Sequence, residues 1–392
     1  MFERFYNRTL RRFFGSRFTG DARIAVVGVG GGGGNAVNNM VENGIEGVDF
    51  IAVNTDSQVL ATNKADRCIQ VGKEATGGLG AGARPEVGVD AVKESRDVIE
   101  HAIQPYDMMF ITAGMGGGTG TGGAPVLASI AQELGILTVG IVTRPFECEG
   151  PRRRRIADQG IEQLREQADT LLVIPNERLL DLANDGTSLE EAFWMADEVL
   201  YDATRGIVNL ITYEGLINLD FADVDRTMRN GGTALLGIST QYNMRQHRTP
   251  RGKAQKTDGG RNDTGETTSR PEEAAVEAIS SPLFDGRSID GADKVLVNVT
   301  GGPSLGFREA MSVVEVIQAE AGENCEVIFG AVTDESIEGQ FQVTVIATGL
   351  DEEQTANHAV RIPSQGIDQI KIPNSHIVES ESVPVAAENG RG

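Results

Sequence analysis

Predominantly apolar runs alternate with amphipathic segments through the first half of the chain. Runs of this kind predict strands that are buried on both faces, as in a parallel sheet, and they lie at 24–27, 48–53, 108–111, 136–143 and 171–174. Apolar residues at helical spacing follow them at 35–41, 86–103, 126–134 and 152–167. The alternation of strand and helix predicts an α/β fold with a doubly wound, mainly parallel sheet.

The pattern changes in the second half. Apolar positions recur at helical spacing from 188 to 212, and Ser188 with Glu191 forms a capping-box signature at the start. About two dozen residues at 1.5 Å each predict a helix of about 36 Å. Alternating, β-branched strands follow at 234–238, 295–299, 326–332 and 342–348, with a helix near 307–320. We expect a second α/β domain that this core helix joins to the first.

These shifts divide the chain into parts. The expected parts are an N-terminal extension 1–20, a first domain 21–187, the core helix 188–213, a second domain 214–350 with a polar insertion 244–273, and a tail 351–392. The insertion holds almost no large apolar residue and is expected to be an exposed loop, and the polar tail is expected to be disordered. The extension alternates arginine with large apolar residues. Such a segment can bind an anionic membrane or dock on a partner, or it can pack against its own domain.

The composition narrows the class of protein. The formal net charge is −22, and only seven of the 35 basic residues are lysine. An acidic, lysine-poor surface is typical of a protein kept soluble in high salt, although an ordinary acidic protein fits too, and it disfavours nucleic acid as a partner. Three distant cysteines and four scattered histidines match no disulfide framework or zinc spacing and suit a reducing cytosol. No run approaches the roughly 20 apolar residues of a membrane span, and no signal-peptide core is present.

Three glycine-rich stretches, 28–34, 77–85 and 113–125, are expected to be loops at the carboxyl end of the sheet. Glycines let consecutive backbone N–H groups converge on one anion, and a helix N-terminus adds partial positive charge. Thr119 and Thr121 offer hydroxyl donors, and Pro125 is expected near the first turn of the following helix. The strand and helix on either side disfavour a flexible linker. The pattern therefore predicts a binding site for a chain of phosphates.

Several motifs together resemble the FtsZ family, the tubulin-like GTPases of prokaryotic cell division. They are GVGGGGGNA at 28–36, NTD at 54–56, GAG at 80–82, GGGTGTG at 116–122, TRPF with the following Glu149 at 143–149, and NLDFAD at 218–223. The resemblance covers about 22–350. It implies a tubulin/FtsZ-like fold, a GTP-binding first domain and a second domain that supplies a loop to the next subunit. The acidic composition, the insertion and the extension are most similar to the second of two haloarchaeal paralogues.

The resemblance also implies the residues of the nucleotide site. The phosphates should be held by Gly31, Gly32, Asn35, Gly117, Gly118 and Thr119, with Gly33, Gly34, Asn54, Gly82, Ala83, Gly116 and Gly120 as further GTP-binding residues. Ribose and phosphate should contact Thr143, Glu149 and Arg153, and guanine should contact Asn176, Phe193 and Asp197. Two departures from the family pattern are Arg84, which stands where the family has Asn, and a tail without the acidic–proline–Phe-Leu-Arg peptide that binds membrane adaptors.

The side-chain chemistry agrees with a guanine nucleotide. The Asp197 carboxylate can accept from the N1–H and amino groups of guanine but not from adenine, and Phe193, one turn earlier, can stack on the base. An ordinary helix face is the alternative. Asp220 and Asp223, with Asn218, can orient a water or help to hold a cation, and helix capping is the alternative for them. The long helix separates them from the glycine stretches, so we expect a neighbouring subunit to complete the site.

The expected function is that of a GTPase that assembles head to tail at a division ring, in the cytoplasm at the inner face of the membrane. Because the glycine stretches hold no lysine, backbone amides, Arg153 and Mg²⁺ must neutralise the phosphates, with K⁺ as a further candidate. Expected partners are a second copy, a division paralogue, and a membrane adaptor on the tail or the N-terminus. The alternatives are a GTP-binding relative without catalysis or assembly, and a Rossmann-type oxidoreductase suggested by GVGGGGGNA.

Overall fold

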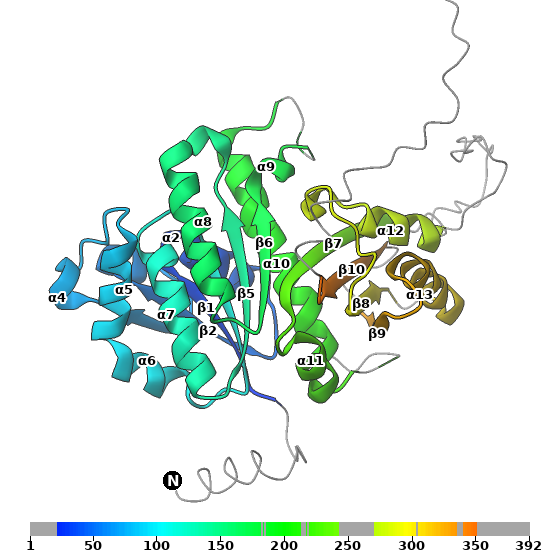
Figure 1. Cartoon of the computed structure of the whole chain (residues 1–392), viewed down its shortest axis with the longest axis horizontal. Helices are drawn as coiled ribbons and strands as arrows, with labels where there is room; N and C mark the ends of the chain where they lie inside the picture. Colours follow the sequence, from blue (N-terminus) through cyan, green and yellow to red (C-terminus); the bar gives the residue numbers. More distant parts are fainter. Residues whose placement is uncertain are drawn as a thin grey trace, which may run out of the picture.

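One continuous sheet runs through both halves of the molecule (Figure 1). The computed structural model describes residues 22–181, 183, 186–212, 217, 219–242, 270–302, 305–334 and 340–350. In this part of the chain the strands, in sheet order, are β3 (Arg67–Gln70), β2 (Val48–Asn54), β1 (Ile24–Val29), β4 (Met108–Gly114), β5 (Leu137–Arg144), β6 (Thr170–Pro175), β7 (Gly232–Tyr242), β10 (Gln340–Thr348), β8 (Lys294–Gly301) and β9 (Glu326–Thr333). All neighbours from β3 to β7 are parallel, β10 is antiparallel to β7 and β8, and β8 is parallel to β9.

Helices cover both faces of this sheet. Those of the first half are α2 (Gly30–Glu42), α3 (Ser57–Ala61), α4 (Lys73–Thr76), α5 (Pro85–Glu94), α6 (Arg96–Ile103), α7 (Thr119–Glu133), the 3-10 turn η1 (Glu147–Glu149), α8 (Pro151–Arg165) and α9 (Asn176–Leu179). Those of the second half are α10 (Leu189–Thr212), α11 (Phe221–Met228), α12 (Arg270–Ile279), the 3-10 turn η3 (Pro282–Phe284) and α13 (Phe307–Ala321).

The central strands explain the continuous apolar runs. Every residue of β1 is buried, because side chains from both faces of the strand enter a core. Val26 and Phe110 pack in the core that α2 and α10 cover, whereas Val27 and Ile111 pack in the core under α5, α6, α7 and α8. A third core fills the second domain. The predicted fold class, two α/β units joined by a long core helix, is confirmed.

Helix α10 spans the sheet from its carboxyl edge to its amino edge. The Ser188 hydroxyl accepts from Glu191 N at 3.2 Å, and Glu191 Oε2 accepts from Ser188 N at 2.6 Å, so the capping box is present. Near this end Phe193 contacts Phe146, which follows the carboxyl end of β5. At the other end, Thr212 lies against Gly47, just before β2 begins. The 24 residues give a length of about 36 Å.

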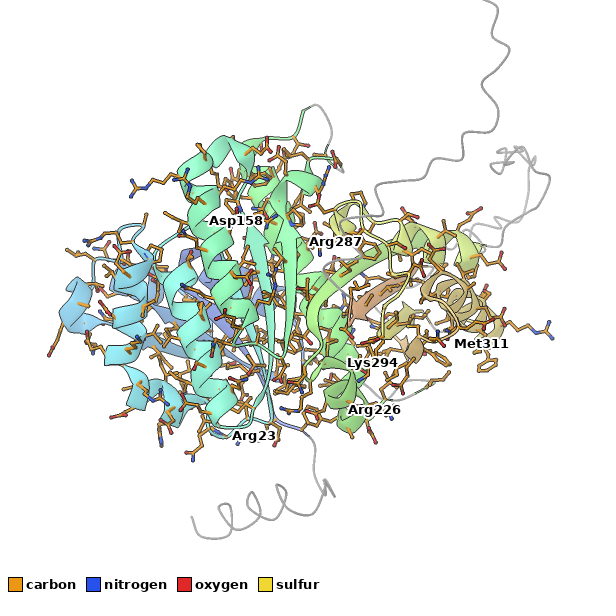
Figure 2. All side chains as sticks on the ribbon, in the orientation of Figure 1. Arg23, Asp158, Arg226, Arg287, Lys294 and Met311 are labelled. Carbon is orange, nitrogen blue, oxygen red and sulfur yellow. The ribbon has the colours of Figure 1, made fainter. Side chains whose placement is uncertain are left out.

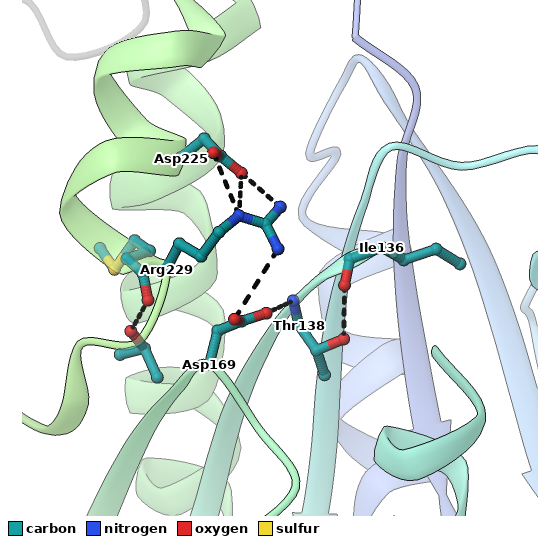
Figure 3. Close-up of polar contacts among 7 residues, drawn as sticks. Ile136, Thr138, Asp169, Asp225 and Arg229 are labelled. Carbon is teal, nitrogen blue, oxygen red and sulfur yellow. Dashed lines mark hydrogen bonds and ion pairs between the residues drawn. The ribbon is translucent and has the colours of Figure 1, made fainter. Parts of the chain in front are cut away.

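Helix α11 is fastened to the amino edge of the sheet (Figure 3). Arg229, directly after α11, bonds Asp225 and lies 3.8 Å from Asp169 at the start of β6. Asp169 Oδ2 in turn accepts from Thr138 N at 2.9 Å, beside the first residue of β5. On the other side, the Lys294 ammonium at the start of β8 donates to the Arg226 carbonyl of α11, and Figure 2 labels both residues. The position of α11 is therefore set from both halves of the molecule.

Some sequence predictions need correction. The helix expected over 86–103 is two helices, because the chain leaves helical geometry at Ser95, whose hydroxyl accepts from Gly72 N. The insertion expected to reach 273 ends earlier, since α12 begins at Arg270. The segments 1–20 and 351–392 and most of the insertion lie outside the described residues. Within the described ranges no helix is long and apolar enough to cross a membrane.

Candidate functional site

The amino ends of α2 and α7 meet at the carboxyl edge of the sheet. Helix α2 follows β1 directly and α7 follows β4 after four residues. They touch through glycine: Gly30 has a φ of +74°, and a Cβ added there would lie 2.8 Å from Gly120 N. Two helix N-termini with unpaired N–H groups therefore point at one region. A polyphosphate fits such a region, because each N-terminus supplies donors and partial positive charge.

Both glycine runs were expected to be loops, but they are largely helical. Helix α7 begins at Thr119, so it starts before the position that the proline suggested, and Pro125 lies inside the helix. Some glycines permit close packing: a Cβ at Gly33 would lie 2.3 Å from the Thr112 carbonyl oxygen. Gly31 and Gly117 differ, because an added Cβ would meet no atom within 4 Å. These two face open space, which is what backbone donors to a phosphate require.

Hydroxyl groups and a third loop complete this end of the site. Thr119 Oγ1 lies 2.6 Å from Thr55 Oγ1 at the end of β2, and Thr121 Oγ1 accepts from Gly116 N at 2.8 Å. The loop 80–84 packs on the start of α7, because a Cβ at Gly118 would lie 2.7 Å from Ala81 Cβ. The structure thus brings the predicted residues of all three glycine stretches together. Gly32 and Gly34 belong to the first stretch and Gly82 and Ala83 to the second, while Asn35 follows on α2 and Asn54 ends β2.

Strand β5 and helix α8 form the next wall. Thr143 is buried and pairs with Gly114 across the β4–β5 ladder. The stem of Arg153 covers Gly116, where an added Cβ would lie 2.6 Å from Arg153 Cγ. The Arg153 guanidinium is 2.9 Å from Glu149 Oε2, and Glu149 Oε1 accepts from Phe146 N at 2.9 Å. A cation and a carboxylate are thereby fixed beside the turn that leads into α7.

A second set of groups suits a purine base. The Phe193 ring meets Phe146 edge to face at 5.4 Å and is 41% exposed. Asn176 is buried at the end of β6, and its Oδ1 has no hydrogen-bond partner among the described residues. Burial raises the pKa of Asp197 to about 6, and its carboxylate has no hydrogen-bond or ion-pair partner in the described part of the chain. A buried acceptor without a partner is costly, so Asn176 Oδ1 points to a ligand that donates hydrogen bonds, and the half-buried Asp197 carboxylate can accept from the same ligand.

The predicted catalytic carboxylates lie elsewhere. Asp220 is the N-cap of α11, where its Oδ1 accepts from Asp223 N at 2.9 Å, and Asp223 is 3.7 Å from Arg226. The capping alternative is thus realised, and the second Asp220 oxygen takes no part in the cap. Asn218 lies outside the described residues. Phe193 and Thr212 are about 28 Å apart along α10, and α11 follows at the amino edge. The structure does not bring Asp220 and Asp223 to the glycine site of the same chain.

Three residues near the site were missed by sequence reasoning. Thr55 was noted only as part of the NTD motif, although its hydroxyl meets Thr119. Phe146, within TRPF, supports the Phe193 ring. Trp194 follows Phe193 and is 54% exposed, and an exposed tryptophan in an aromatic-poor chain was the available signal. No group of three or more His, Cys, Asp or Glu suited to a metal ion occurs among the described side chains.

Known proteins match this architecture over most of the chain. The sequence model of the Tubulin/FtsZ family, GTPase domain, matches residues 23–184, and that of the FtsZ family, C-terminal domain, matches 260–351. A point mutant of FtsZ from M. jannaschii is 41% identical, with a TM-score of 0.76, over 89% of this chain and 95% of that one. An empty FtsZ dimer of M. jannaschii is 42% identical, with a TM-score of 0.75, over 88% and 92%.

A more distant likeness concerns the fold alone. CetZ1 from Haloferax volcanii, a GDP-bound monomer, is 23% identical with a TM-score of 0.69, over 84% of this chain and 95% of that one. The FtsZ matches combine high identity with nearly full coverage of both chains, and the GTPase-domain match spans the glycine motifs. The chain is therefore a guanine-nucleotide-binding GTPase that belongs to the Tubulin/FtsZ family and is most simply described as FtsZ-like.

Proposed function

We propose that this protein is a cytoskeletal GTPase that polymerises head to tail at the division site, where each subunit completes the GTP site of its neighbour. The proposal places it in the cytoplasm at the inner face of the membrane, as part of a septal ring. Solved structures of similar proteins support assembly, because one structure of M. jannaschii FtsZ is a dimer and CetZ2 from Haloferax volcanii forms a GTPγS-bound protofilament. The acidic, lysine-poor composition supports a salt-loving, archaeal cytoplasm.

The observation that carries the proposal is the separation of two half-sites by α10. Groups that suit phosphate and guanine lie at the carboxyl edge of the sheet, whereas Asp220 and Asp223 lie beyond the far end of the helix, at the amino edge. A carboxylate must come within hydrogen-bond reach of the attacking water to orient it. Head-to-tail stacking brings the amino edge of one subunit onto the carboxyl edge of the next, which supplies that contact.

The residues at the carboxyl edge fit GTP. Backbone N–H groups around Gly31 and Gly117 would hold phosphates, Arg153 would add positive charge, and Asn176 and Asp197 would read the guanine edge. Mg²⁺ would be held mainly by phosphate oxygens and water, since it accepts few protein ligands, and it would neutralise charge that develops on the phosphates. K⁺ is a further candidate cation in a salt-loving cytoplasm.

The first test is the dependence of GTP turnover on protein concentration in high-potassium buffer. The proposal predicts a cooperative rise of the specific rate above a threshold concentration, in step with light scattering. A specific rate that is independent of concentration would mean that one chain holds the complete site. A nucleotide-binding relative without catalysis, which the engagement of Asp220 in capping favours, would bind GTP and show no turnover.

Complementation tests the shared site directly. Asp220→Asn keeps an N-cap acceptor but removes the charge, so α11 should stay folded while turnover falls by roughly 10²–10⁴-fold. Gly118→Asp puts a side chain where Ala81 Cβ and Arg84 N leave no room, so it should lose nucleotide binding but keep its own carboxylates. A mixture of the two should regain turnover. Co-assembly without regained turnover would contradict a shared site.

The segments that would attach the protein to the membrane are the extension 1–20 and the tail 351–392. The extension 1–20 combines five arginines with five phenylalanines, one tyrosine and one leucine, and the tail lacks the adaptor peptide of many bacterial relatives. We propose that the extension or the tail contacts the membrane or an adaptor, and that a division paralogue is a further partner. The Rossmann-type oxidoreductase is wrong, because the GTPase-domain match covers the motif that suggested it.

A further inference from the structure

Strand β3 leaves one edge of the ten-stranded sheet open. It is the first strand in the sheet order and pairs with β2 alone. Val71 N donates to Asn54 O of β2, so by alternation the backbone groups of Cys68 and Gln70 face away from β2. In the described part of the chain these groups have no backbone partner. The opposite edge differs, because β9 is bridged at Ala331 by Ile217.

A groove runs along this open edge. It has a volume of about 720 Å³, and its walls are β3, Lys73 of α4, and the end of α5 with α6. All four residues of β3 line it, as expected where a strand offers its backbone edge. Val98, on α6, contributes an apolar surface that is 58% exposed. The groove thus offers what an added strand needs: free backbone groups and an apolar contact.

The groove is basic in a protein of net charge −22. Arg67, Lys73 and His101 line it and are exposed. Glu94 is the acidic residue of the lining, and its two oxygens accept from Glu74 N and Ala75 N at 3.1 Å each. Charge complementarity therefore favours an acidic occupant.

We propose that residues 377–383 of this same chain dock in the groove as an added strand beside β3. The segment reads Ile-Val-Glu-Ser-Glu-Ser-Val, without proline or glycine, and Pro384 ends it. In an extended chain Glu379 and Glu381 share one face with Ile377 and Val383 at its ends. The two carboxylates of that face complement the basic lining of the groove, Arg67, Lys73 and His101, and its apolar ends suit Val98. Covering the edge also removes a site at which other chains would pair and aggregate.

The connecting chain is long enough. The chain leaves the described part after β10, where Gly349 N donates to Gly231 O beside β7. Six strand spacings separate β7 from β3, which is roughly 29 Å. The 26 residues between 351 and 376 have an end-to-end distance of roughly 28 Å as a flexible chain. A tether that matches its span gives an effective concentration on the order of millimolar, so a weak strand contact is sufficient.

The faces of the two strands predict a cross-link. Arg67 donates to the Ala102 carbonyl, so Arg67 and Ile69 face α6, and Cys68 faces the other side. With Glu379 and Glu381 toward α6, Ser380 lies on the side of Cys68. A disulfide requires Cα atoms about 4.4–6.8 Å apart, so it forms only between neighbouring strands.

The test uses the full chain with Cys148→Ser, which leaves Cys68 exposed and Cys325 buried. Ser380→Cys under mild oxidation should give a disulfide to Cys68 within one chain, identified by peptide mass spectrometry. Ser364→Cys, earlier in the tail, is the matched control and should cross-link poorly. Equal cross-linking of the two variants would overturn the proposal. A disulfide-linked dimer would also overturn it, because the occupant would then belong to a second copy.

Charge reversal and hydrogen exchange give independent readouts. Glu379→Lys with Glu381→Lys should lower the cross-linking rate roughly 2- to 30-fold, as expected for the loss of two exposed ion pairs, whereas Glu352→Lys with Glu353→Lys should not. The same reversal should speed the exchange of the Cys68 and Gln70 amides. If these amides already exchange in the unsubstituted chain at the rate of fully exposed amides, no strand is added at β3.

Discussion

Asp197→Asn tests the proposed recognition of the guanine base, and we expect opposite effects on stability and on GTP binding. The carboxyl pKa is raised from 3.8 to about 6 by burial. At 1.36 kcal/mol per unit, a shift of about two units has an upper limit of about 3 kcal/mol. Because solvent reaches part of the group, we expect the amide to raise the free energy of unfolding of the nucleotide-free protein by on the order of 2 kcal/mol at pH 7.5.

The sign of the pH dependence follows from the raised pKa. The folded protein binds the Asp197 proton more tightly than the unfolded chain does, so the associated stability is fully present below pH 3.8 and is lost as the pH rises through about 6. Denaturant unfolding of nucleotide-free protein should therefore separate Asp197→Asn from the unsubstituted chain at pH 7.5. The two should converge near pH 4, where the folded-state carboxyl is already protonated.

Binding changes in the other direction. Guanine donates two hydrogen bonds to a carboxylate, and losing a charged partner costs roughly 1.5–3 kcal/mol of GTP affinity. In the unsubstituted chain only the ionised form binds well, so with a pKa of about 6 the GTP affinity should fall about tenfold between pH 7.5 and pH 5. Asp197→Asn should bind weakly at both pH values. Titration calorimetry with GTP measures both effects.

Asp202 is the matched control. It lies on the same helix, and burial and the Glu198 carboxylate raise its pKa to about 6 as well, but its hydrogen-bond partner is Gln342 of β10. Asp202→Asn should leave GTP affinity and its pH dependence unchanged. Equal GTP affinity of Asp197→Asn and the unsubstituted chain, or a GTP affinity that does not change between pH 7.5 and pH 5, would refute the assignment of Asp197 to the base.

Further variants probe other parts of the molecule. Gly31→Ala should lower GTP affinity and change the melting temperature little, because its Cβ enters the open space. Gly122→Ala should lower the free energy of unfolding by about 1–3 kcal/mol, because its Cβ would lie 2.0 Å from the Pro85 carbonyl oxygen. A lower melting temperature for Gly31→Ala than for Gly122→Ala would contradict these two predictions. Arg229→Gln should cost about 1 kcal/mol in denaturant unfolding and leave nucleotide binding intact. Deletion of 1–20 should lower co-sedimentation with anionic liposomes at unchanged GTP affinity, and unaltered sedimentation would assign the segment to the fold.

The sheet could be predicted from sequence because its central strands are buried on both faces. An apolar run such as Met108 to Ile111 is too short for a buried helix, and its length suits a strand that is buried on both faces. The core helix was equally readable, since its apolar stripe and its capping box agree. These signals are local, and the structure did not override them.

The glycine runs show where local reasoning fails. Glycine disfavours helix by about 1 kcal/mol relative to alanine, so a run of five predicts a loop. The structure makes Gly30 to Gly34 helical because tertiary contact outweighs that preference: the Gly28 Cβ position lies 2.3 Å from the Gly33 carbonyl oxygen. The sequence also cannot show that Asn176 Oδ1 has no partner among the described residues, because this depends on which distant side chains reach it.

The role of Asp220 illustrates why capping and catalysis need not be alternatives. One of its oxygens accepts from Asp223 N and closes the first turn of α11, which fixes the side-chain rotamer. A fixed rotamer is what a water-orienting carboxylate requires, because positioning and not strong basicity is the main need of phosphoryl transfer. The anchors of α11 at Arg226 and Arg229 hold the helix, and with it the cap, against both halves of the molecule. The same contacts that explain Asp220 as a structural residue therefore hold its side chain in place while its second oxygen stays outside the cap, which agrees with the proposal that a neighbouring subunit uses that oxygen.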